Sequence, residues 1–135
     1  MYLHFLQTNQ QKEAFIELAH RFANIDGNIN KKEHNLLRNY LFELDMIPSD
    51  VVFASERDLE DIVSDITDES IRTIFLIELL MLVNTDGDYN DEERHVALQL
   101  QQLFDISDDK LKACMAWIKR YDALKIDGVK LILPQ

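Results

Sequence analysis

The chain has 135 residues, 47% hydrophobic and 29% charged, a balance typical of a single globular domain and not of a disordered segment. Its net charge of −11 argues against nucleic acid as a partner, because phosphate binding needs clustered Lys and Arg, and it suits a basic protein surface or a divalent cation better. One cysteine excludes an intrachain disulfide and a cysteine metal cluster, and the longest apolar run, residues 74–83, is too short for a transmembrane segment.

The small number of turn-forming residues predicts the fold class. Three Gly and two Pro favour long helices joined by short loops over a many-stranded β fold. The first six residues, MYLHFL, lack the basic region and the cleavage site of a signal peptide. We therefore expect an all-α protein of the cytoplasm, where Cys114 stays reduced.

A first long helix is predicted from about Asn9 to Ile25. Thr8 followed three residues later by Gln11 is a capping box, which places the helix start, and Asp26-Gly27 supplies the glycine that ends it. At 100° per residue the helix has one apolar and one polar face. The polar face is expected in water and contains Glu17, His20, Arg21 and Asn24.

A second helix follows the first Asp-Gly turn. Asn30 and Glu33 form the next capping box and open a helix that buries residues up to Leu44 and leaves Phe42 on its outer side. Pro48 then begins a segment, residues 48–64, in which one or two short helices are expected.

The central helix is predicted to begin at Thr67 and to end at Asp86-Gly87. It is apolar on nearly all sides, and such a helix belongs inside a bundle. A helix to about residue 104 follows. Ser107 is expected to cap a last helix over residues 108–124, which a third Asp-Gly turn at 127–128 ends. The apolar tail after it, residues 129–134, is expected to dock on the N-terminal residues.

The chain contains an internal repeat in which residues 14–46 match residues 74–106 at a constant offset. Two equivalent helical hairpins facing each other would bury both apolar stripes in one core. We therefore predict a single domain over residues 1–135, a compact bundle of about six to seven helices built from two pseudo-symmetric helix-turn-helix halves. The matched pairs are Phe15/Phe75, Asn24/Asn84, Asp26/Asp86, Gly27/Gly87, Asn30/Asn90, Glu33/Glu93 and Asp45/Asp105.

The two repeated motifs, AHRFANIDGNINKKE and LLMLVNTDGDYNDEE, each have a helix ending in Asp-Gly and a Glu six positions after the Gly. Together they resemble the tellurite-resistance TerB family, and the N-terminal domain of DjlA-type co-chaperones is similar. The resemblance covers residues 12–122. It implies an all-helical, stress-associated domain without catalytic activity that occurs beside other domains. It also implies metal ligands near the turns, which by position are Asp26, Glu33, Asp86 and Glu93.

The second turn is the stronger candidate for a divalent cation. Asp86, Asp88 and Glu93 offer the oxygen ligands that Ca²⁺ prefers. The spacing begins like an EF-hand loop, but Asp91 replaces the required Gly and Ala97 the final Glu, so an EF-hand proper is excluded. The alternative is a capped turn without metal. It also accounts for the first copy, which lacks three acids of the second and has Asn28, Lys31 and Lys32 instead.

Glu78 is the single charged residue of most interest, because it falls among apolar neighbours on the central helix. Burial of an unpaired carboxylate costs several kcal/mol. Two explanations stay open: an ion pair or hydrogen bond within the fold, or a pocket for a ligand or partner. The basic residues considered in reach are His20, Arg21 and Arg38.

Three function classes follow. The preferred class is a non-enzymatic domain that acts through protein contacts. Its partner would be a foreign protein or, in a homodimer, a second copy of the chain. The second is a divalent-cation sensor that uses the acidic turn at 86–93. The third, a metal-dependent enzyme, has little support, because Glu17-x-x-His20 points away from the apolar face and Glu92-x-x-His95 begins in a first helical turn.

Overall fold

The computed structural model describes residues 1–23, 31–47, 57–83 and 91–134. Over these residues the chain is all-α and has no strand, which confirms the predicted class of helical bundle. A short 3₁₀ helix, η1 (Leu3–Phe5), precedes six α-helices. These are α1 (Asn9–Ala23), α2 (Lys31–Glu43), α3 (Leu59–Val63), α4 (Glu69–Val83), α5 (Asp91–Leu103) and α6 (Asp108–Ile132).

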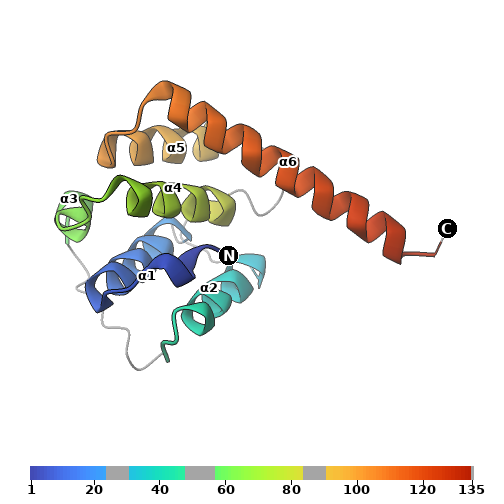
Figure 1. Cartoon of the computed structure of the whole chain (residues 1–135), viewed down its shortest axis with the longest axis horizontal. Coiled ribbons are helices and arrows are strands. Elements are labelled where there is room, and N and C mark those ends of the chain that lie inside the picture. Colours follow the sequence, from blue (N-terminus) through green and yellow to red (C-terminus); the bar gives the residue numbers. More distant parts are fainter. Residues whose placement is uncertain (24–30, 48–56, 84–90, 135) are drawn as a thin grey trace.

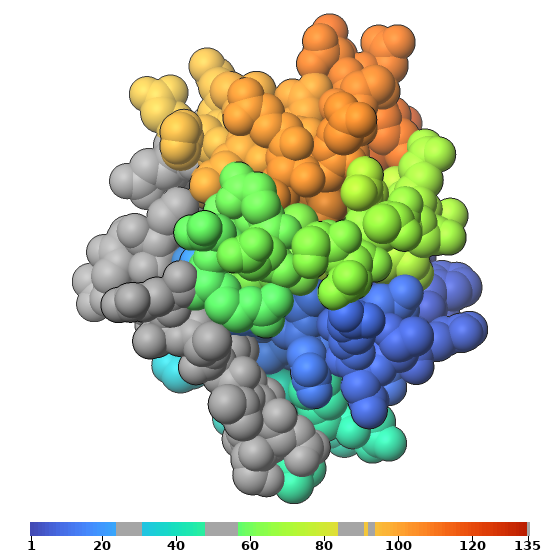
Figure 2. Space-filling view, turned by 90° about the vertical axis from the view of Figure 1, so that its left-hand side faces the viewer, coloured from blue at the N-terminus to red at the C-terminus, as the bar shows by residue number. Residues whose placement is uncertain are grey.

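Helices α1 and α4 form the centre of the bundle. They pack on each other, α2 covers α1 on one side, and α5 and α6 cover α4 on the other (Figure 1). The short α3 contacts both α1 and α5, and Figure 2 shows it between the α1 layer and the α5–α6 layer. The central position predicted for the nearly all-apolar α4 is therefore confirmed, and α1 shares it.

A row of aromatic rings joins the two halves through the core. Phe15 of α1 meets Tyr40 of α2 and Phe75 of α4 edge to face, with ring centroids 5.0 and 5.3 Å apart. Phe75 meets Phe104 in the same geometry at 5.8 Å. Edge-to-face contacts are favoured because the positive edge of one ring faces the negative face of the next. Phe15 and Phe75, equivalent in the repeat, thus lie at the middle of one continuous core.

The two hairpins are alike in length and in the way each ends. Helices α1 and α2 have the same bounds as α4 and α5, sixty residues earlier. At the end of each hairpin an aspartate, Asp45 or Asp105, takes a left-handed conformation with φ of 57° or 53°. The following amide, of Met46 or Ile106, donates back five residues to Leu41 or Gln101. This is the Schellman pattern of helix termination in both copies.

The capping residues near the start of α1 and α6 act as predicted. The Gln11 amide donates to Thr8 Oγ1 at 3.1 Å, and the Thr8 amide donates back to Gln11 Oε1. Ser107 Oγ accepts from the Lys110 amide at 3.1 Å. The central helix begins slightly later than expected, since Asp68 and not Thr67 accepts from the amide of Ile71. The caps expected at Asn30 and Asn90 lie outside the described residues.

The prediction for the last helix was wrong. We expected it to stop near Leu124, yet α6 runs through Asp127 and Gly128 to Ile132. A glycine inside a helix costs only about 1 kcal/mol relative to alanine and does not by itself end one. The tail also does not dock on the N-terminal residues, because Leu131 and Ile132 are 88% and 81% exposed. Instead, the second half of α6 projects from the bundle (Figure 1).

No described helix combines the length and the apolar character needed to cross a bilayer.

Candidate functional site

Most of the residues predicted to hold a cation lie outside the described part of the chain. These are Asp26, Asp86 and Asp88, and the side chain of Glu93 is likewise not described. Glu33 lies in the first turn of α2 and is buried. Within residues 1–23, 31–47, 57–83 and 91–134, no three His, Cys, Asp or Glu side chains gather as a metal site requires. The cation hypothesis therefore stays a prediction.

Glu78 is buried on α4, with 1% of its surface exposed, and its carboxylate is paired with the start of the chain. The Tyr2 amide donates to Glu78 Oε1 at 2.7 Å, and the Met1 ammonium lies 3.1 Å from the same oxygen. None of the basic residues considered from the sequence is its partner in these contacts. A helical wheel could not indicate this pairing, because the positive group is the α-amino group and not a side chain.

A second carboxylate completes this arrangement. Glu43 at the end of α2 accepts from the Met1 ammonium at 2.7 Å and from the Leu3 amide at 3.0 Å. The two acids, one on α2 and one on α4, therefore both contact the Met1 ammonium, and each also accepts from a backbone amide of the N-terminal segment. Charge-assisted hydrogen bonds of this kind are the stronger ones in proteins, so they hold η1 against the bundle.

Tyr40 links the same region to the core. Its hydroxyl donates to the backbone oxygen of Glu78 at 3.0 Å. Burial, together with the nearby carboxylates of Glu78 and Glu43, raises the pKa of Tyr40 well above its ordinary value, so the phenol stays protonated and remains a donor.

A groove lies beside this region but does not include Glu78. It has a volume of about 640 Å³ and runs between η1, α4 and the first turn of α6. Its walls are mostly apolar, and Glu69 and Lys110 are the charged residues among them. The residues that line it are Tyr2, Phe5, Glu69, Ser70, Ile71, Thr73, Ile74, Ile77 and Lys110.

The expected water-facing position of Glu17 was wrong. The residue is buried, and its Oε2 lies 3.4 Å from Nη1 of Arg57. Arg57 lies two residues before α3 and also donates to the backbone oxygen of Asp61. The side of α1 that looks polar on a helical wheel is therefore covered by α3 and by Arg57. His20 and Arg21 on that side are half-buried.

His20 is expected to make stability depend on pH. Burial, and second the nearby His34, lower its pKa from 6.5, so the unfolded chain binds the proton more readily than the folded one. The contribution of neutral His20 is complete above pH 6.5 and is lost as the pH falls toward the lowered value. In urea titrations at about pH 7.5 and about pH 5.5, His20→Asn should lose less stability between the two pH values than the parent chain. An equal loss in both proteins would contradict this.

Cys114 is packed in the α6 interface and is 6% exposed. Burial raises the pKa of its thiol, although the nearby Lys110 acts in the opposite direction. It therefore behaves as a small core residue, as expected.

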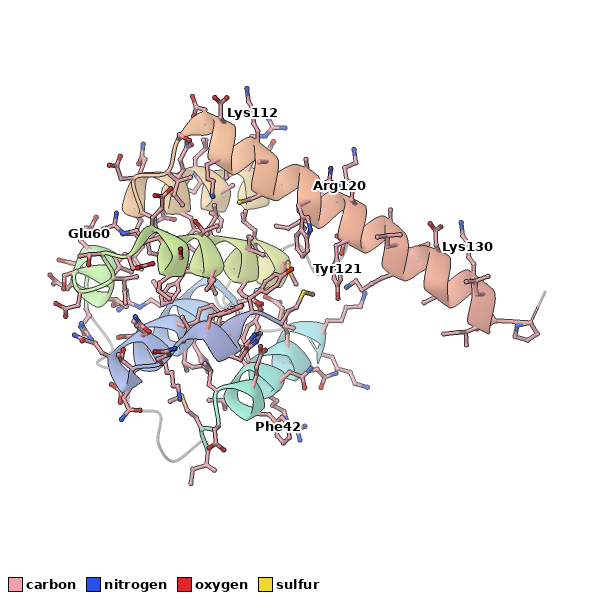
Figure 3. The ribbon with its side chains drawn as sticks, in the orientation of Figure 1. Phe42, Glu60, Lys112, Arg120, Tyr121 and Lys130 are labelled. Carbon is pink, nitrogen blue, oxygen red and sulfur yellow. The ribbon has the colours of Figure 1, made fainter. Side chains whose placement is uncertain are left out.

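The most exposed apolar surface of the described chain lies on the second half of α6. We call residues 119–133 the C-terminal arm. Within it Leu124, Leu131 and Ile132 are 68%, 88% and 81% exposed. Lys112 and Lys130 point away from the bundle on the outer side of α6, whereas Tyr121 points to the opposite side (Figure 3). The arm is therefore amphipathic, and no element among the described residues covers its apolar side.

Comparisons of the chain with protein-family models, with curated proteins and with solved structures find no match, so the TerB-like assignment stays a prediction based on the two motifs.

Proposed function

We propose that this chain is a non-catalytic binding domain that acts through protein–protein contacts, and that the C-terminal arm makes them. The observation that carries the proposal is the exposed apolar side of the arm. Isolated surface hydrophobics are ordinary, but several on one projecting helix form a patch of the kind that marks interaction sites.

The length of α6 supports the same conclusion. Its 25 residues extend for about 37 Å, and only the first half packs on α4. Isolated helices shorter than about 12–15 residues are marginal in water, and the helical part of the arm, residues 119–132, is in this range. A partner that covers the arm would stabilise its helix and remove the apolar side chains from water at once.

The resemblance to the TerB family supports a stress-associated role for such a domain. The buried ion pair of Glu78 supports a structural use for that carboxylate, because its nearest oxygen is already bound by the N-terminal segment. The function proposed for the chain therefore depends on its surface and not on an enclosed reactive group.

Site-specific photo-crosslinking in cells tests this proposal. A photo-reactive residue at Leu131 should capture a discrete protein, whereas the same residue at Phe42 should capture little. Both side chains are 88% exposed, so the second position controls for exposure alone. Equal, diffuse labelling from the two positions would contradict a specific binding surface on the arm.

A further inference from the structure

We infer that the partner of the C-terminal arm is a second copy of this chain, and that two α6 helices pair antiparallel across a two-fold axis. This inference rests on the proposed function and names the partner of the same surface. It is carried by the spacing of the side chains along α6, by their exposure and by the position of their charges.

The spacing along α6 is that of a helix-pairing seam. Trp117, Tyr121, Leu124, Gly128 and Leu131 recur at intervals of four and three residues. Large side chains at this spacing form one stripe that stays in contact with a neighbouring helix. Trp117 and Tyr121 already stack on each other, with centroids 5.5 Å apart and ring planes 10° apart. The stripe therefore begins on the bundle and continues along the arm.

An antiparallel pair centred between Tyr121 and Leu124 matches large residues with smaller ones. Tyr121 then faces Leu124 of the second copy, and Trp117 faces Gly128 of the second copy. Gly128 suits this position because no atom lies within 4 Å of where its Cβ would be, which leaves space for an indole ring. Each of these contacts occurs twice, as the symmetry of a two-fold interface requires.

The charges beside the stripe select the antiparallel direction. Arg120 and Asp127 lie seven residues apart on the same flank, so in the antiparallel register each faces its opposite charge in the second copy. In a parallel pair, Arg120 would face Lys125 of the second copy, which is repulsive. Lys125 is already placed over the Tyr121 ring, 4.8 Å from its centroid, and 3.7 Å from Asp122 in the same chain.

The charge of the whole molecule favours a protein over an anionic membrane. Helix α6 carries six basic and four acidic residues, so the rest of the chain carries eight basic and twenty-one acidic residues. The acidic bundle would oppose approach to an anionic lipid surface, so a protein surface is the better partner for the arm.

Light scattering of the purified full chain during size-exclusion chromatography tests the inference. The average mass should rise from one chain toward two as the protein concentration increases. Asp127→Arg, and separately Arg120→Asp, should each weaken the dimer about tenfold, because attraction becomes repulsion at two symmetry-related contacts. The double variant Arg120→Asp/Asp127→Arg should restore it. Lys130→Glu, on the outer side of the same helix, should leave the dimer unchanged.

The folding of each variant is checked by circular dichroism, since all the substituted side chains are on the surface of the arm. A second measurement determines the direction of pairing. In the antiparallel dimer, spin labels at Lys130 should lie clearly farther apart than labels at Ala123, because Lys130 is about 11 Å along the helix from the two-fold axis and Ala123 is almost level with it. In a parallel dimer the two label distances should be about equal, because both positions lie on the outer side of the helix and neither is displaced along the helix axis between the copies.

A chain that stays monomeric at every concentration would overturn the inference, and so would a double variant that fails to restore the dimer. Binding of the monomer to phosphatidylserine-containing vesicles would overturn it in favour of a membrane. If the purified chain is monomeric while Leu131 captures a foreign protein in cells, the second-copy inference fails but the proposed function stands. If neither is seen, both fail.

Discussion

Replacing Phe75 with alanine is expected to lower the free energy of unfolding by about 4 kcal/mol. Phe75 is fully buried on α4, and its ring contacts Phe15 on one side and Phe104 on the other. The substitution removes the buried ring and leaves a cavity at the point where the two hairpins meet, and it also breaks two edge-to-face contacts. Because domains of this size have only about 5–15 kcal/mol of stability, the variant should be close to unfolding at physiological temperature.

Urea denaturation followed by circular dichroism measures this effect. The midpoint of the Phe75→Ala variant should fall strongly, with a slope similar to that of the parent chain. Phe42→Ala is the matched control, because the same ring is removed from a position that is 88% exposed. It should change stability by no more than about 0.5 kcal/mol. A small effect at Phe75, or similar effects at both positions, would mean that the aromatic row is not the core of the fold.

Replacing Glu78 with alanine is the second substitution with a large expected effect. It should lower the free energy of unfolding by about 3 kcal/mol. The carboxylate accepts from the Tyr2 amide and pairs with the Met1 ammonium, and both groups lose this partner in the variant. Glu78→Gln keeps an oxygen that can accept from the Tyr2 amide but loses the charge, so its loss should be about half as large. Glu43→Ala should cost no more than about 1 kcal/mol, because Glu43 is partly exposed to solvent.

The test is the order of stability of the three variants Glu78→Ala, Glu78→Gln and Glu43→Ala. Equilibrium unfolding in urea gives their free energies, and hydrogen exchange at the Tyr2 and Leu3 amides reports whether the N-terminal segment has been released. Alanine at Glu78 should be the least stable and should expose both amides. If Glu43→Ala lowers the free energy of unfolding as much as Glu78→Ala does, the burial of Glu78 does not make its contact with the N-terminal segment the stronger of the two.

The helical class, the two hairpins and most of the core could be predicted from the amino-acid sequence. Periodicity identified α1, α2, α4 and α5, and the Thr8–Gln11 pair and Ser107 marked the starts of α1 and α6. The repeat also paired Asp45 with Asp105, and these two residues end their hairpins with the same left-handed turn. Such features are local, because capping and apolar spacing depend on residues only a few positions apart.

The partners of the buried polar residues, in contrast, depend on how the helices pack and could not be predicted from local patterns. Glu17 lies on the polar side of a helical wheel, yet Arg57, forty residues away, and α3 cover it. Glu78 pairs with the amino group of the first residue, which no side-chain pattern could indicate. The structure likewise decided that α6 passes through Gly128, because a glycine ends a helix only where the backbone turns left-handed, and here it stays helical. The exposed arm that results is the surface on which the proposed function depends.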